Sequence, residues 1–288
     1  MEDKTKIREK VKIALEEDLG SGDITSGVLF DRDFNVRAFL IAKEDAVLCG
    51  MDVFKEVFLT LSSSCIFNFG FKDGDFLRKN TNVGSISCSV KTMMAAERTA
   101  LNFLQHLSGV ATLTRKFVEE SGGLDIYDTR KTSPFLRELE KYAVRTGGGR
   151  NHRHGLYDMV LIKDNHIYAY MKKNRAGRVK AISEVVDKAK KAVGCRYKVE
   201  VEVENFIEAK EAFLAGADII MFDNAAVTEL KEFVRFLGVD RNKVEIEWSG
   251  NVTLETVACM KGLPVNRVSV GAVTHSAAAA DFSLKLER

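Results

Sequence analysis

Residues 197–224 read YKVEVEVENFIEAKEAFLAGADIIMFDN, and the order of elements in this stretch decides the fold. Two short apolar runs flank a segment whose apolar residues recur at helical spacing, which is typical of two strands joined by a helix. Such a strand–helix–strand unit belongs to α/β proteins with a parallel sheet or barrel. Both apolar runs end in polar residues, namely Glu202, Glu204, Asp223 and Asn224.

The same alternation recurs from about residue 110 onward. Further apolar runs are LDIYD, YDMVLIKDN, KVEIEWSGN and RVSVGA, and all but the last precede a helical stretch. With about six such units and no G-x-G-x-x-G motif after the first strand, the sequence predicts an α/β barrel rather than a dinucleotide-binding sheet.

The first third of the chain predicts a small mixed α/β unit instead. Its patterns indicate a helix that ends at Gly20, an extended segment at 35–48, a helix at 51–61, strand-like runs over 65–90, and a helix at 92–108 that Gly109 stops.

The charge balance excludes some classes of protein. The 43 basic and 41 acidic side chains give a net charge of +2, so no overall field favours nucleic acid or an anionic membrane. The N-terminus mixes both charge signs, unlike a signal peptide, and no segment reaches the roughly 18 apolar residues of a membrane span. We therefore expect a cytoplasmic protein whose anion binding, if any, is local.

The cysteines predict no disulfide framework and no zinc site. They are odd in number, widely spaced and without a C-x-x-C pair, so we expect reduced thiols in the core. Their positions are Cys49, Cys65, Cys88, Cys195 and Cys259.

Polar residues at the strand ends indicate the active site. In a parallel α/β barrel the carboxyl ends of all strands meet at one face, which holds the active site. The groups expected to converge there are Asp128–Lys131, Lys163–His166, Glu202, Glu204, Asp223, Asn224, Ser249–Asn251 and the region of Gly271.

Residues 128–155, DTRKTSPFLRELEKYAVRTGGGRNHRHG, hold nine basic side chains against three acids. Ser133 as N-cap, a first-turn proline and Gly147 as C-cap predict a helix over 134–146. Its charges are expected to form a solvated, salt-bridged face: Arg137, Glu138, Glu140, Lys141 and Arg145.

The basic residues on either side of that helix are candidates for anion binding. Arg130 and Lys131 sit between strand and helix, where charges and backbone donors reach a ligand. His152 and Arg153 follow a triple glycine that allows a close ligand approach.

Two acids, Glu202 and Asp223, complete the predicted site. In a cationic pocket they could hold a divalent metal, bind ribose hydroxyls or stabilise a developing cation. His166, at the polar tip KDNH, favours a functional role, whereas His106 and His275 are as compatible with a structural role as with a direct one.

The motifs resemble those of the quinolinate phosphoribosyltransferase family over nearly the whole chain. They are EEDLGSGDITS, AERTALNFLQHLSGVAT, DTRKTSP, LEKYAVRTGGGRNHRHGLYDMVLIKDNH, VEVEVEN, AGADIIMFDN and SVGAVTHSAAAADFSLKL. The resemblance implies an N-terminal α/β sandwich domain at 1–110, with which the tail at 275–288 is expected to pack, and an incomplete α/β barrel at 111–274. It implies a homodimer in which each first domain caps the partner's barrel.

The resemblance also implies a reaction. Quinolinate and phosphoribosyl pyrophosphate give nicotinate mononucleotide, pyrophosphate and carbon dioxide, with magnesium and no organic cofactor. Two carboxylates, a phosphate and a pyrophosphate explain why several cationic side chains would share one site.

Matching motif to motif assigns the roles. The resemblance implies that Thr132 and His166 contact substrate and that Arg98 arrives from the other subunit. It implies that the quinolinate carboxylates are surrounded by Arg130, Lys131, His152, Arg153 and Lys163. The catalytic set is Lys131, Lys163, Glu202 and Asp223, the last two near ribose and metal. The 5-phosphate loops are Ser249, Gly250 and Asn251, and Gly271, Ala272 and Val273.

The chain departs from the family in two places. Asn251 stands where a glycine is usual, and it tolerates left-handed backbone better than most residues. Pro134-Phe135 stands where Pro-Gly is usual. Three alternative interpretations remain. Two are enzymes: a ModD-type pyrophosphorylase, a group that lacks the KDNH tip, and nicotinate phosphoribosyltransferase. The third is a non-catalytic phosphosugar-binding barrel, which would have no need for acids at its strand ends.

Overall fold

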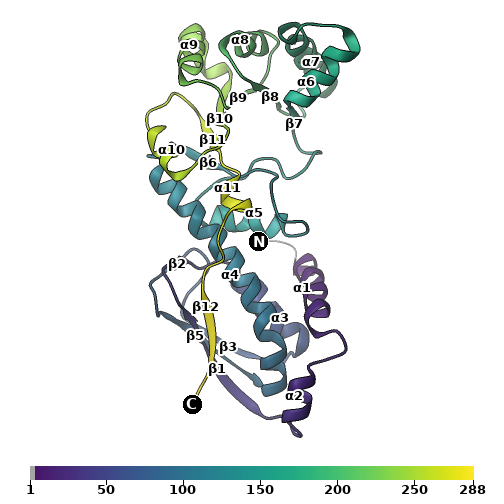
Figure 1. Cartoon of the computed structure of the whole chain (residues 1–288), viewed down its shortest axis with the longest axis vertical. Helices are drawn as coiled ribbons and strands as arrows, with labels where there is room; N and C mark the ends of the chain where they lie inside the picture. The colour runs from purple at the N-terminus through teal and green to yellow at the C-terminus, as the bar shows by residue number, and fades with distance from the viewer. Residues whose placement is uncertain (1–3) are drawn as a thin grey trace. The chain divides into compact units, whose positions relative to one another are not determined.

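The computed structural model describes residues 4–288, and it divides into two compact units. The first unit comprises the chain up to Lys116 together with Thr132–Gly149 and Val273–Arg288, and the second comprises Phe117–Lys131 and Arg150–Ala272. Residues 111–116, 132–149 and 273–274 of the segment expected to form the barrel belong to the first unit. The mixed α/β class holds for both units (Figure 1).

The first unit is built on an antiparallel sheet. Its strand order is β12 (Phe282–Leu286), β1 (Asn35–Ala42), β5 (Asn82–Ser89) and β3 (Ile66–Phe69), beside a small pair, β2 (Ala46–Val47) and β4 (Phe76–Leu77). The C-terminal strand lies along β1, with Ala38 opposite Leu286 (Figure 1). The tail is thus part of this sheet.

Helices cover the sheet and supply its core. They are α1 (Lys4–Leu19), α2 (Ile24–Leu29), α3 (Met51–Leu61), α4 (Val90–Glu120) and α5 (Arg137–Thr146). The predicted apolar face of the first helix is confirmed, since Ile7, Val11 and Leu15 are buried. The predicted helix at 51–61 is confirmed at both ends.

The prediction that Gly109 stops a helix is wrong. Helix α4 runs through it to Glu120. A Cβ atom at Gly109 would lie 2.0 Å from the backbone oxygen of Ala278. The glycine therefore allows the C-terminal segment to pack against the helix, and close packing outweighs the poor helix propensity of glycine.

The helix predicted at 134–146 begins later, at Arg137, although Gly147 is its C-cap as expected. Phe135 has a φ of +65°, which is left-handed backbone and cannot start a right-handed helix.

The prediction of a solvated face on this helix is also wrong in part. Lys141 and Glu140 are fully buried. Glu140 accepts hydrogen bonds from the Ser133 amide, at 3.2 Å, and lies 2.8 Å from His106 Nε2. These two charges are therefore internal groups of the first unit, whereas Arg145 is exposed as expected.

Phe135 offers a test of backbone strain. Its side chain is 86% exposed, so it contributes little packing to offset the left-handed conformation. We expect Phe135→Gly to raise the free energy of unfolding by about 1 kcal/mol, measured as a higher unfolding midpoint. Phe135→Ala removes the same ring but keeps the strain, and should stay near the wild type. Equal midpoints for the two variants would show that the backbone is not strained.

The second unit holds six parallel strands with helices outside them (Figure 1). The order is β6 (Asp125–Tyr127), β11 (Arg267–Ser269), β10 (Glu245–Ser249), β9 (Ile219–Asp223), β8 (Val199–Val203) and β7 (Val160–Ile162). Strands β6 and β7 follow one another in the chain yet occupy opposite edges, as in an open α/β barrel.

The helices of this unit are α6 (Asp164–Asn174), α7 (Arg178–Val193), α8 (Phe206–Leu214), α9 (Val227–Leu237), the 3-10 helix Gly238–Lys243 and α10 (Leu254–Cys259), and α11 (Ala272–His275) begins at its end. Helix α6 was not predicted. It starts at the KDNH tip, where Lys163 is its N-cap and His166 Nδ1 accepts from the Lys163 amide at 2.9 Å.

The cysteine prediction was right about the thiols and wrong about some locations. All five are free, but Cys195 and Cys259 are exposed, whereas Cys49 and Cys88 are buried. Among residues 4–288, no helix is long and apolar enough to cross a membrane.

Candidate active site

A cavity of about 380 Å³ opens at the carboxyl ends of the strands in the second unit. Its lining combines basic, acidic and hydroxyl groups with two apolar side chains: Thr129, Arg130, Lys131, His152, Arg153, Leu161, Lys163, Glu202, Met221, Asp223, Ser249 and Ser269. The predicted strand-end face therefore encloses a cavity.

Buried Asp128 brings the two basic segments together. Its carboxylate accepts from the His152 amide at 2.8 Å and from Asn151 Nδ2 at 2.7 Å. The backbone of Tyr127 also forms a parallel bridge to Arg150. These bonds place Arg130–Lys131, at the end of β6, beside His152–Arg153.

Arg153 places a positive charge at a buried position in the cavity wall. Its side chain donates to the Met159 carbonyl at 3.2 Å, and its buried Nε has no hydrogen-bond partner among the described residues. Burial and the like charge of Arg130 lower the pKa of Arg153. Burial and the nearby cation both disfavour the charged form of Arg153, and a bound anion would stabilise that form.

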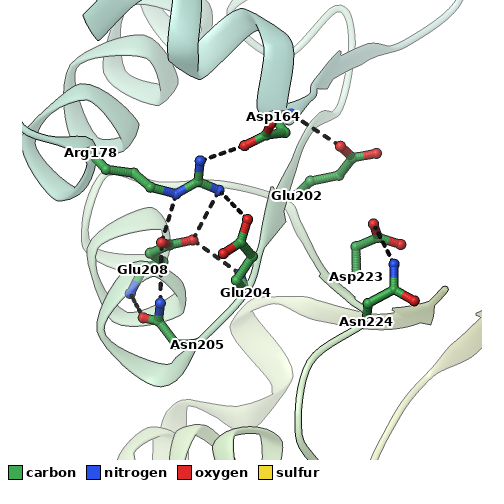
Figure 2. Close-up of polar contacts among 8 residues, drawn as sticks. All are labelled: Asp164, Arg178, Glu202, Glu204, Asn205, Glu208, Asp223 and Asn224. Carbon is green, nitrogen blue, oxygen red and sulfur yellow. Dashed lines mark hydrogen bonds and ion pairs between the residues drawn. The ribbon is translucent and has the colours of Figure 1, made fainter.

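The acidic wall comes from adjacent strands. Glu202 lies near the end of β8 and forms an ion pair with Lys163, while its other oxygen accepts from the Asp164 amide at 3.2 Å. Asp223 ends β9, and Asn224 Nδ2 donates to it at 3.2 Å (Figure 2). Both acids also line a neighbouring cavity of about 410 Å³.

Arg178 fixes the loops around that second cavity. It contacts Asp164, Glu204 at 3.1 Å and Glu208 at 2.8 Å (Figure 2). Burial opposes the charge of Arg178, but the hydrogen bonds that it donates to Glu208 and Asp164 raise its pKa. Arg178 thereby anchors the start of α6, next to Lys163.

A buried polar cluster lies behind the cavity wall, and sequence reasoning missed it. His152 Nε2 lies 3.1 Å from Glu200 and 3.5 Å from Glu247, and both glutamates are fully buried. Among residues 4–288, these three form the one group whose ligand atoms all lie within 4.8 Å of one another, as a metal site requires. The one sequence feature that points to this cluster is the alternation in VEVEV and EIEWS, which places the acids of each strand on one face.

The electrostatics and hydrogen bonds of the cluster place a proton on His152 Nε2. Burial lowers the pKa of His152, but Glu200 and Glu247 outweigh it and raise the pKa to about 10. The Arg153 amide donates to His152 Nδ1 at 2.9 Å, which favours the neutral ring. Nε2 is protonated in either form. Burial and the charge of Glu200 raise the pKa of Glu247 to about 7.

The predicted phosphate loop reaches the cavity through Ser249 alone. Gly250 has a φ of +103°, and a Cβ atom there would lie 2.4 Å from Asn224 Oδ1, so glycine is needed. Asn251 has a φ of +44°, and its tolerance of left-handed backbone is confirmed.

Eight of the predicted site residues line the cavity: Arg130, Lys131, His152, Arg153, Lys163, Glu202, Asp223 and Ser249. The others do not: Arg98, Thr132, His166, Gly250, Asn251, Gly271, Ala272 and Val273. Arg98 and Thr132 belong to the first unit, where Thr132 accepts from Arg137 Nε at 3.0 Å. Leu161, Met221 and Ser269 line the cavity without having been singled out, and Thr129 lines it as part of the predicted segment Asp128–Lys131.

Two family profiles together match most of the chain. Residues 23–108 match "Quinolinate phosphoribosyl transferase, N-terminal domain", and residues 110–285 match "Quinolinate phosphoribosyl transferase, C-terminal domain".

Curated relatives and solved structures agree with those profiles. A probable nicotinate-nucleotide pyrophosphorylase [carboxylating] of Bacillus subtilis is 40% identical, over 93% of this chain and 89% of its own length. The chloroplastic nicotinate-nucleotide pyrophosphorylase [carboxylating] of Arabidopsis thaliana is 39% identical, over 96% and 82%. The crystal structure of NadC from Streptococcus pyogenes is 40% identical, covers 100% of this chain and 98% of its own, and has a TM-score of 0.92.

Proposed function

The chain belongs to the quinolinate phosphoribosyltransferase family, and we propose that it transfers phosphoribose from phosphoribosyl pyrophosphate to quinolinate. The products are nicotinate mononucleotide, pyrophosphate and carbon dioxide, in NAD biosynthesis. The observation that carries the proposal is the buried Arg153 guanidinium beside Arg130, in a cavity that Lys131 and Lys163 also line. Several cations in one small cavity suit a dicarboxylate better than a monocarboxylate.

The acids opposite the cations suit the transfer step. Displacement at the anomeric carbon develops positive charge on the ribose ring, as in other glycosyl transfers. Glu202 stabilises that charge electrostatically without becoming a nucleophile. Its ion pair with Lys163 holds the carboxylate at the cavity.

Decarboxylation is the second chemical event. The C–C bond to the 2-carboxylate breaks, carbon dioxide leaves, and the electron pair on the ring carbon takes up a proton. Cationic charge next to the ring stabilises that electron pair, and we assign this role to Lys131, which lines the cavity.

We also propose magnesium as the metal, held by Glu202 and Asp223. Carboxylate oxygens are the ligands that Mg²⁺ prefers, and the two acids share both cavities at neighbouring strand ends. The buried group of His152, Glu200 and Glu247 fits magnesium poorly, because it includes an imidazole, whereas Mg²⁺ prefers oxygen ligands. When bound, magnesium would offset negative charge on the departing pyrophosphate.

The proposal extends to assembly and location. We propose a homodimer in which Arg98 of the partner subunit completes the site, because Arg98 is exposed on α4 and does not line this chain's cavity. The cytoplasmic location stays a prediction from the sequence.

A substrate comparison tests the proposal. With phosphoribosyl pyrophosphate and Mg²⁺, we expect quinolinate to give equal amounts of carbon dioxide and nicotinate mononucleotide, and nicotinate to react at least about a hundredfold more slowly, because one carboxylate leaves buried cations unpaired. Labelled carbon dioxide and product chromatography measure both. A chelator should abolish turnover and Mg²⁺ restore it. Turnover of nicotinate without turnover of quinolinate would contradict the assignment.

A further inference from the structure

Glu247 lies directly behind two side chains that line the cavity. It sits in the middle of β10, its side chain is fully buried, and it does not itself line the cavity. Its Oε1 accepts a hydrogen bond from Ser269 and lies 3.5 Å from His152 Nε2. One carboxylate therefore touches cavity-lining groups from two separate segments of the chain.

The partners of His152 leave the ring little freedom. The Arg153 amide donates to Nδ1 at 2.9 Å, and Nε2 faces Glu200 at 3.1 Å on one side and Glu247 on the other. Both nitrogens are thus engaged, and the ring plane is set by groups on three segments.

The sheet register explains why Glu247 lies beneath the cavity and not in its lining. In β10 and β11, Glu247 pairs with Arg267, so Ser249 and Ser269 lie two residues further toward the carboxyl ends. The two serines line the cavity, whereas Glu247 and Arg267 form the layer beneath it. Arg267 Nε lies 3.8 Å from Glu247 Oε2, so this layer contains a counter-charge.

We propose that Glu247 is a positioning residue, which fixes the His152 ring through Nε2 so that Nδ1 holds the Arg153 backbone amide, and with it the Arg153 side chain, at the carboxylate-binding wall of the cavity. This inference rests on the proposed function, in which His152 and Arg153 lie around the quinolinate carboxylates. An isolated buried carboxylate would be costly to keep, and the hydrogen bonds to His152 and Ser269 are what stabilise it.

Kinetics of Glu247→Ala test the proposal. A displaced His152 ring no longer holds the Arg153 amide in place, which weakens quinolinate binding by about one charge-assisted hydrogen bond, so KM for quinolinate should rise about tenfold. We expect kcat to change less than about threefold, because the residues acting on the reacting atoms are intact. A purely structural role would lower the active fraction, and hence kcat, at unchanged KM.

Two matched variants sharpen the test. Glu247→Gln keeps an oxygen that accepts the same hydrogen bonds, so it should return KM to within about threefold of the wild type. Glu245→Gln changes a same-face acid at the start of β10, whose partners Lys198 and Arg267 do not line the cavity, and it should leave KM unchanged.

A spectroscopic arm works without turnover. In ¹⁵N-histidine-labelled full-length protein, with the His152 signals identified by a His152→Asn variant, Glu247→Ala should shift the Nε2 resonance and Glu247→Gln should not. If wild-type protein fails to convert quinolinate, the proposed function falls, but this arm still tests the positioning. A wild-type KM and an unshifted Nε2 resonance in Glu247→Ala would overturn it.

Discussion

Replacing Arg153 with alanine is expected to lower kcat/KM for quinolinate by about three orders of magnitude, because two charge-assisted hydrogen bonds contribute about 1.5–3 kcal/mol each. Arg153 is 8% exposed, and its Nε has no partner among residues 4–288, so we expect the dicarboxylate to supply a counter-charge when it binds. Steady-state kinetics with varied quinolinate measure the loss.

Two further variants separate this effect from damage to the fold. Arg153→Lys restores the charge but not the planar fork, so it should recover only part of the activity. Arg150→Ala removes an exposed arginine three residues earlier, whose partner is Asp125 at 3.0 Å, and should behave like the wild type. An Arg153→Ala enzyme with normal kcat/KM would show that the substrate binds elsewhere.

The sequence predicted the active-site face because topology alone places it. In parallel strands joined by helices, all carboxyl ends lie on one side, so Glu202, Asp223 and Ser249 had to meet even though they are far apart in the chain. The helical and strand periods predicted most elements for the same local reason. The resemblance to a family then supplied the chemistry.

What the sequence could not show depended on long-range partners. Glu200 and Glu247 alternate with apolar residues, which is equally typical of acids facing solvent, and their burial depends on His152, 48 residues from Glu200. Gly109 ends no helix because a distant segment packs on it. Lys141 lies in a helix whose charges look solvated, yet the first unit covers it. In each case tertiary contact outweighed local preference.

Mixing two inactive variants is expected to restore activity if the sites are shared between subunits. Arg98→Ala and Lys131→Ala chains should each be nearly inactive as pure dimers. In a mixed dimer, the Arg98→Ala barrel keeps its own Lys131 and receives the partner's Arg98 from the Lys131→Ala chain. Random pairing makes half of the dimers mixed, each with one intact site, so about a quarter of wild-type activity should return.

A second pair of variants tests whether such recovery comes from active sites that are shared between subunits. Lys131 and Lys163 both line the cavity of one chain, so a mixture of Lys131→Ala and Lys163→Ala chains cannot assemble an intact site in any dimer. It should stay inactive. Native mass spectrometry counts the mixed dimers in both experiments. Recovery confined to the Arg98 mixture requires that arginine to act across a subunit boundary, whereas no recovery despite abundant mixed dimers would confine each active site to one chain.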